Sequence, residues 1–303
     1  MEQSIDNLLK GYENSDSSLK LRILYDNGIA LSKEEALKEL MRSAVVKRLT
    51  GDIIEKPLFY VWRIVALSEI PYSIHLEYTQ NLIERIYRKL ATPYGFSLSG
   101  NEKMFLPCYN AMLVSALSRL GRCNDAEVQK AVDWIMTYQP MERGLEVIAP
   151  KLEFKKYGGC FKNTPCYIGL AKSAMALLEY RKACKTNEPD DKIKMGIDYL
   201  LKHQLFKRLK TGEPITKRIL DISFPESYHL NIVELVRIMK EADCTDKEQT
   251  NEAVSYLLSQ RRKDSKWKIN YRYKADGYIV FDQGSKSGDW VSYIIQNSIE
   301  KRV

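Results

Sequence analysis

The sequence predicts an all-α protein built from repeated helical hairpins, on the strength of three observations. Apolar residues recur at helical spacing along almost the whole chain. The helices come in pairs, each about 15 residues long and separated by loops rich in glycine, proline or asparagine. Equivalent positions return roughly every 55 to 65 residues, as in repeat proteins whose hairpins bury their apolar faces against one another. We therefore expect one domain over residues 1–303.

One set of helices is apolar on most of its surface and begins at a proline or beside an aromatic residue. Proline suits the first helical turn because its missing N–H has no intrahelical partner there. A helix that is apolar on most sides must be covered on most sides, so we expect this set to line the inside. The five segments are 57–67, 107–117, 165–178, 225–236 and 288–295.

The alternating set is amphipathic, mostly acidic at its start, and is expected on the outside. Its segments are 75–90, 124–139, 189–204 and 245–260. A first helical pair, 17–27 and 32–48, lies within residues 1–50, and Ser32 and Glu35 have the spacing of a capping box. Residues 267–282 alternate polar and apolar side chains, which predicts a small β-hairpin turning at 275–277.

Composition narrows the function classes. Six cysteines spread through the chain, without an apolar leader at Met1, argue against a disulfide framework and predict a reducing, cytoplasmic setting. No apolar stretch approaches the ~20 residues of a membrane span. The net charge is +8, but the basic residues are interleaved with 39 acidic ones, so no nucleic-acid partner is expected. Basic clusters at 207–218 and 261–268 are either solvated loops or sites for a phosphate-bearing ligand.

Two of these hairpins carry a family resemblance. The segments PCYNAMLVSAL and PCYIGLAKSAM, each followed by an amphipathic helix that ends in glutamine, resemble the repeats of the terpenoid cyclase and protein prenyltransferase superfamily. The segment QRRKDSKW, residues 260–267, resembles a degenerate glutamine-to-tryptophan motif of squalene cyclases. The order of segments is most similar to microbial squalene-cyclase-like proteins of unestablished function. The resemblance implies an α/α toroid of five to six hairpins, with toroid repeats and a closing helix over residues 57–301.

The resemblance also suggests which chemistry to look for. The Asp-x-Asp-Asp acid of class II cyclases is absent from the sequence. Prenyltransferases hold zinc through Asp-x-Cys-Tyr and Asp-x-Tyr-His segments, and this chain has Thr164-Pro-Cys166-Tyr and Glu226-Ser-Tyr-His229 at the matching places. Cys160 is a candidate third ligand beside Cys166 and His229, with water in the fourth position. The alternative is that these are ordinary buried thiols and a hydrogen-bonded histidine.

If the inner helices run parallel, their first turns meet at one end of a central cavity. Positive helix ends favour anions and thiolates there, so Cys166 and His229 are the candidate catalytic residues. We expect the ligand-binding residues at this end to be Cys108, Tyr109, Tyr167, Tyr228, Trp290, Tyr60 and Trp62. The alternative is that the aromatic residues belong to the core.

Two functions follow from these expectations. In the first, the toroid binds or transforms an apolar, isoprenoid-like ligand with an anionic head in its central cavity. In the second, it is a non-catalytic scaffold for a protein partner, as repeat proteins often are. Zinc is the cofactor that the first reading allows, and a large exposed apolar patch would favour the second.

Overall fold

The computed structural model describes residues 2–145 and 164–299, and these are mostly helical. The helices are α1 (Glu2–Leu8), α2 (Ser17–Asp26), α3 (Lys33–Arg42), α4 (Ala44–Leu49), α5 (Pro57–Ser68), α6 (Glu77–Leu90), α7 (Pro107–Arg119), α8 (Ala126–Tyr138), α10 (Tyr167–Cys184), α11 (Asp190–Lys202), α12 (Ile232–Glu241), α13 (Asn251–Ser259) and α14 (Asp289–Ile299). Short 3₁₀ helices lie at Ser73–His75, Glu102–Met104 and Glu248–Thr250. None of the described helices is long and apolar enough to cross a membrane.

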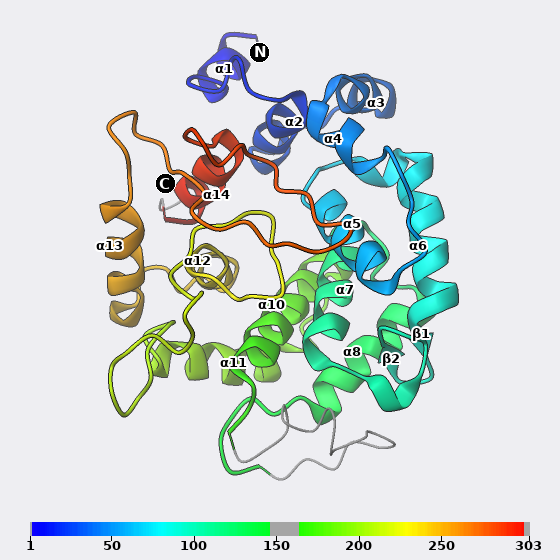
Figure 1. Ribbon diagram of the computed structural model, residues 1–303, viewed down its shortest axis with the longest axis vertical. Helices are drawn as coiled ribbons and strands as arrows, with labels where there is room; N and C mark the ends of the chain where they lie inside the picture. Colours follow the sequence, from blue (N-terminus) through cyan, green and yellow to red (C-terminus); the bar gives the residue numbers. More distant parts are fainter. Residues whose placement is uncertain (1, 146–163, 300–303) are drawn as a thin grey trace.

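Helices α5, α7, α10, α12 and α14 form an inner set, and α6, α8, α11 and α13 flank it on the outside (Figure 1). The division follows from the side chains. Every residue of α7 from Pro107 to Ser118 is buried, whereas α6 buries one stripe that includes Leu82, Ile83 and Ile86. The expected division into inner and outer helices is confirmed by these burial patterns.

The inner helices contact one another in chain order, from α5 through α7, α10 and α12 to α14. Helix α2 connects the last of them to the first. Asp26 of α2 accepts hydrogen bonds from Tyr293 and Asn297 of α14, at 3.1 and 3.4 Å. Arg22 of α2 donates to Glu69, which directly follows α5.

Local signals place several helix starts correctly. Pro57 and Pro107 are the first residues of α5 and α7, and Ser32 and Glu35 form the capping box at the start of α3. The expected helix 225–236 is shorter, because Asn231 caps α12 and residues 225–231 are not helical. The expected helix 32–48 is divided at Ser43, whose hydroxyl caps α4.

The expected β-hairpin at 267–282 is wrong. That segment is irregular apart from a single bridge between Trp267 and Gly288, and the small antiparallel sheet pairs β1 (Ala91–Thr92) with β2 (Gly95–Phe96). The reason is that the segment bonds to the body of the protein instead of to itself: Asn270 exchanges hydrogen bonds with Ile222. Only the expected turn is present, where the Tyr278 N–H donates to the Ala275 carbonyl.

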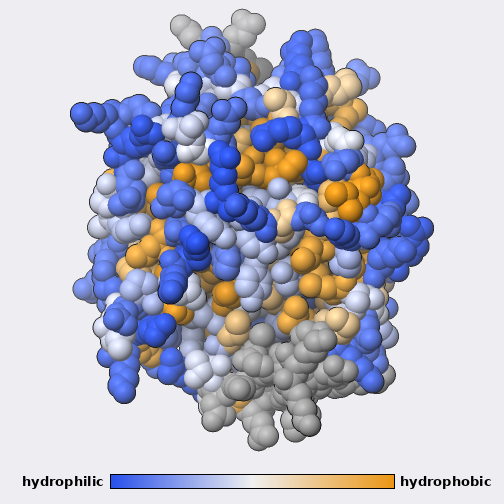
Figure 2. All heavy atoms as spheres, viewed as in Figure 1, coloured by the Kyte–Doolittle hydropathy of each residue, from blue (hydrophilic) through white to orange (hydrophobic). Residues whose placement is uncertain are grey.

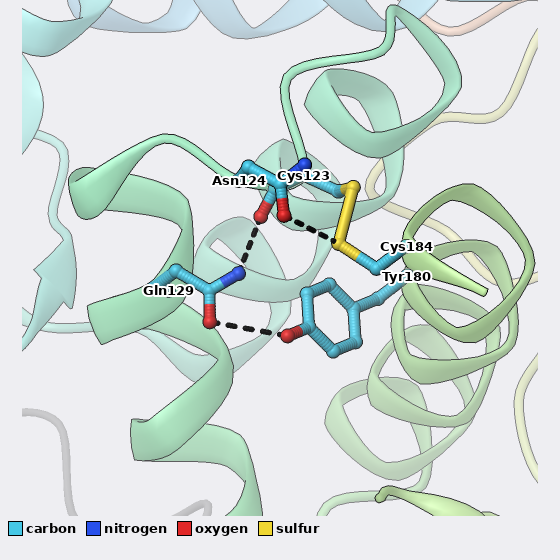
Figure 3. Close-up of a disulfide and its surroundings, with 5 residues drawn as sticks. All are labelled: Cys123, Asn124, Gln129, Tyr180 and Cys184. Atoms are coloured by element: carbon cyan, nitrogen blue, oxygen red, sulfur yellow. Dashed lines mark hydrogen bonds between the residues drawn. A yellow bond between two sulfur atoms is a disulfide. The ribbon is translucent and has the colours of Figure 1, made fainter. Parts of the chain in front are cut away.

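The sequence argued against a disulfide framework, but one pair of cysteines is bonded. Cys123 and Cys184 form a disulfide, with their Cα atoms 6.0 Å apart (Figure 3). Cys123 follows inner helix α7 and Cys184 ends inner helix α10, so they occupy similar places in adjacent repeats. Their separation of 61 residues therefore matches the repeat length. Beside the bridge, Tyr180 donates to Gln129, which in turn donates to the carbonyl of Cys123.

Candidate functional site

An aromatic cluster occupies the end of the protein where the inner helices begin. Trp62 of α5 contacts Tyr109 of α7, with ring centroids 5.9 Å apart, and Tyr109 stacks on Tyr228 at the same distance. Tyr273 and Tyr278, from the irregular segment after α13, pack against Trp62 at 5.1 and 6.0 Å. Side chains of the protein itself therefore fill the space around Trp62.

The candidate catalytic residues lie at the same end. His229 contacts the rings of Tyr228, Tyr271 and Tyr273. Burial, together with nearby Arg218, lowers the pKa of His229, which keeps the imidazole neutral at pH 7. Burial and the neighbouring Cys166 together raise the pKa of the Cys108 thiol to about 12, so Cys108 is a protonated thiol. The proposed pairing of Cys166 with His229 stays a prediction.

The other expected ligand-binding residues lie in three different places. The hydroxyl of Tyr60 donates to Glu55. Trp290 packs between Phe224 and Phe281, with ring centroids 5.8 and 4.9 Å away. Tyr167 faces α11, where it contacts Tyr199 and His203.

The expected zinc ligands are Cys160, Cys166 and His229. Among residues 2–145 and 164–299, no group of three or more His, Cys, Asp or Glu side chains is placed to hold a metal ion. Cys160 lies outside the described residues. Cys166 and His229 by themselves would supply two of the four positions of a zinc site.

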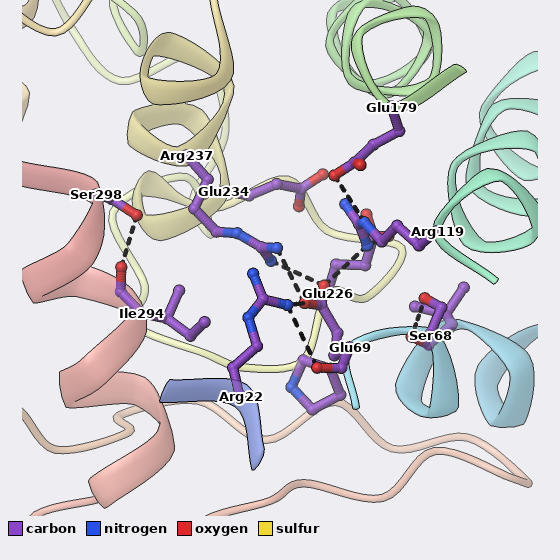
Figure 4. A network of polar contacts seen from close by, with 12 residues as sticks. Arg22, Ser68, Glu69, Arg119, Glu179, Glu226, Glu234, Arg237, Ile294 and Ser298 are labelled. Carbon is purple, nitrogen blue, oxygen red and sulfur yellow. Dashed lines mark hydrogen bonds and ion pairs between the residues drawn. The ribbon is translucent and has the colours of Figure 1, made fainter. Parts of the chain in front are cut away.

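The core of the protein around Glu69 is charged, which was not expected from the sequence. Glu69 is completely buried and accepts two hydrogen bonds from Arg237 and one from Arg119, each 2.9 Å long. Arg22 approaches the same carboxylate at 3.4 Å, and Figure 4 shows the three arginines converging on it. Burial alone would raise the pKa of Glu69, but the arginines outweigh it and lower that pKa to about 2.

The charged core continues toward the aromatic cluster through Lys172 of α10. Its ammonium group lies 2.8 Å from Glu226 and 2.5 Å from Glu234, and all three side chains are buried. Burial and the charge of Glu226 outweigh the nearby Lys172 and raise the pKa of Glu234 to about 8. Lys172 and Arg119 overcome the burial of Glu226 and lower its pKa. At neutral pH Glu226 is therefore ionised, whereas Glu234 mostly holds its proton.

The sequence contained little signal for this charged core. Glu69 and Arg119 lie at the ends of inner helices, where charged residues normally reach solvent or complement the helix dipole. One clue was Lys172, which stands among apolar and small residues from Ile168 to Leu178. A charge at such a position requires a buried partner.

A groove between α10, α11 and the loop 205–215 combines aromatic and basic side chains. One cavity of about 280 Å³ has Tyr167, Tyr199 and His203 among its lining residues, all three at most 9% exposed. A neighbouring cavity of about 330 Å³ shares Arg143, Tyr199 and Leu209 with it. We call the two together the α10–α11 groove.

The charges around the first cavity of the groove have one sign. Arg143, Arg208 and Lys210 are exposed at its edge, and none of the described residues that line it is acidic. Arg208 and Lys210 belong to the basic cluster noted in the sequence.

At the base of this cavity, His203 Nδ1 lies 2.7 Å from the Lys207 carbonyl, which assigns the proton to Nδ1. Its Nε2 is buried and has no hydrogen-bond partner in the described part of the chain. Burial lowers the pKa of His203, so Nε2 remains an acceptor.

Comparison of the chain with protein-family models, with curated protein sequences and with solved structures finds no match.

Proposed function

We propose that the chain is an α/α toroid that binds a ligand with an aromatic or apolar body and an anionic head in the α10–α11 groove. The supporting observation is the arrangement of three cations around an aromatic base, without a carboxylate in the lining of that cavity. Phosphate and carboxylate groups suit Arg143, Arg208 and Lys210, because charge-assisted hydrogen bonds are the strong ones. The aromatic rings below them suit the apolar body.

The contacts among the inner helices, together with those of α2, support a closed toroid. The inner helices contact in chain order, and α2 bridges α14 and α5. The resemblance to terpenoid cyclases and prenyltransferases makes isoprenoid diphosphates the first ligands to test. A ligand on the axis at Trp62 would require the segment 267–288 to move, because Tyr273 and Tyr278 occupy that space. The groove requires no such movement.

The scaffold alternative has less support. The large apolar side chains exposed on the described surface are scattered over different elements: Tyr25, Met41, Ile54, Leu145, Met195, Leu209 and Leu258. On the face seen in Figure 2, hydrophilic side chains interrupt the apolar areas. A docking platform normally presents a larger continuous apolar patch.

The test is titration calorimetry with geranyl diphosphate, geraniol and inorganic pyrophosphate. We expect geranyl diphosphate to bind at least about tenfold more tightly than either part alone, because the groove has a place for each. The double variant Arg208→Gln, Lys210→Gln should lose about tenfold or more in affinity for the diphosphate. Lys217→Gln is the control, since Lys217 is exposed two residues beyond this loop and does not line either cavity. Equal binding by the double variant and the control would refute the proposal.

A further inference from the structure

A third cavity, of about 320 Å³, lies where α5, α7 and α10 end, beside α2. Ser68, Arg119 and Ala183 from the ends of the three helices line it, together with Arg22 of α2. We call it the α2 cavity. It lies at the opposite end of the inner helices from Tyr109 and Tyr228, and Arg22 and Arg119 connect it to the charged core.

The charges in the α2 cavity are arranged as three acid–base pairs. Arg22 binds Asp26 at 2.8 Å and Arg119 binds Glu179 at 2.7 Å. At the rim, Lys182 binds Glu241 at 3.1 Å. The described lining therefore contains three cations and three carboxylates. In the first cavity of the groove, by contrast, the charged residues of the described lining are all basic.

These pairs leave hydrogen-bonding capacity unused. Arg22 and Arg119 bond through Nε and Nη1, and the Nη2 of each makes no hydrogen bond within residues 2–145 and 164–299. Within the same residues, Glu179 bonds through Oε1 only. Ser118, which lines the same cavity and is 1% exposed, has an Oγ without a hydrogen-bond partner in the described structure.

A ligand with one charge would leave this balanced, partly desolvated cavity with a net excess of that charge. A ligand carrying both charges would add none, and it could use the arginine donors and the glutamate acceptor together. Ile70, Pro71 and Ile74 form an apolar side of the cavity, next to the ring of Tyr72. The ligand should therefore also have an apolar body.

We infer that the α2 cavity binds a small zwitterion that joins a carboxylate and an ammonium group to an apolar body, the chemistry of a free α-amino acid. Its carboxylate bonds to the Nη2 groups of Arg22 and Arg119. Its ammonium group lies by Glu179 and Glu241, and its side chain packs on the apolar side. This site is separate from the α10–α11 groove, so either can fail without the other.

The experiment compares phenylalanine with 2-phenylethylamine, which lacks the carboxylate, and with 3-phenylpropionate, which lacks the ammonium group. Calorimetry on the full chain should show phenylalanine binding at least about tenfold more tightly than either analogue. Leucine and tyrosine extend the series to other apolar bodies. Millimolar or weaker binding of all three amino acids, or an analogue binding as tightly as phenylalanine, would overturn the inference.

Two variants locate the binding. Ala183 is exposed and lines the cavity, so Ala183→Trp should obstruct it and weaken phenylalanine binding by about tenfold or more. Ala126→Trp is the matched control on another exposed helical alanine, and it should leave binding unchanged. Glu241→Gln should weaken phenylalanine binding but not that of 3-phenylpropionate. An unaltered affinity in folded Ala183→Trp, verified by circular dichroism, would rule out the α2 cavity as the site.

Discussion

Glu226 and Glu234 show how the same side chain acquires two different states within one buried cluster. Both approach Lys172, but Glu226 also lies within 3.8 Å of Arg119. Two carboxylates share one ammonium group in a desolvated place, so the one with the additional cation ionises and the other retains its proton. Neutral Glu234 therefore resembles a glutamine more than a glutamate at pH 7.

We predict that Glu234→Gln changes the free energy of unfolding at pH 7 by less than about 1 kcal/mol, because it replaces a mostly neutral group with a neutral one. Glu226→Gln should cost about 3–5 kcal/mol, since it removes the ionised partner of Lys172, and Glu234 can take that role only by giving up its proton in a buried place. Urea unfolding of both variants and the wild type measures the difference. Equal losses in the two variants would contradict the assignment of the proton.

The same assignment gives a pH dependence with a definite sign. The folded pKa of Glu234, about 8, is above its ordinary value of 4.5. The folded state therefore binds the proton more tightly, and this contribution to stability is complete below pH 4.5 and is lost as the pH rises toward 8. Relative to Glu234→Gln, the wild type should lose stability across that interval, which urea titrations at several pH values can follow.

At the residue scale, the sequence predicted the positions of side chains better than their partners. Helical periodicity and prolines placed Trp62 and Tyr109 at one end of the inner helices, and there they contact each other. Periodicity carries no information on long-range ion pairs, so Glu69 and Arg237, 168 residues apart, could not be connected. The groove was indicated only by its basic loop and by Tyr167, because its aromatic base comes from two different helices.

At the element scale, the sequence predicted an element correctly where contacts between residues close in the chain determine its conformation. The capping box of α3 involves residues three apart, and it was predicted correctly. The segment 267–282 has the alternation of a strand, but its backbone and rings bind to Ile222 and Trp62. At Gly277, φ is +85° and a Cβ would lie 2.6 Å from the Phe59 Cα, so only glycine allows the turn to approach α5 this closely. Tertiary contacts decided the conformation of this segment.

The disulfide is a connection between elements, and its contribution to stability can be measured. Reduction by dithiothreitol should lower the free energy of unfolding by about 2–4 kcal/mol, because the bridge closes a long loop in the unfolded chain. The double variant Cys123→Ala, Cys184→Ala should show a similar loss and no further response to reductant. If dithiothreitol still lowered the free energy of unfolding of the double variant, the effect would belong to other cysteines.

At the scale of the whole molecule, Glu69 connects helices that are distant in sequence. It follows α5 and binds one arginine from each of α2, α7 and α12. Apolar packing between neighbouring helices stabilises each adjacent pair, whereas this carboxylate contacts several helices at the same time. Its removal would leave three buried or partly buried guanidinium groups competing for the remaining acids.

We therefore predict that Glu69→Gln lowers the free energy of unfolding by about 3–5 kcal/mol or prevents folding, the cost of leaving buried charges unpaired. Glu39→Gln is the control, because it breaks an exposed pair with Arg42 and should cost no more than about 0.5 kcal/mol. The folded pKa of Glu69, about 2, lies below its ordinary 4.5, so its contribution is present above pH 4.5 and is lost as the pH falls toward 2. The gap in stability between wild type and Glu69→Gln should therefore narrow over this acidic interval in urea titrations. A gap that is small at pH 7, or that stays constant down to pH 2, would show that Glu69 does not hold these helices together.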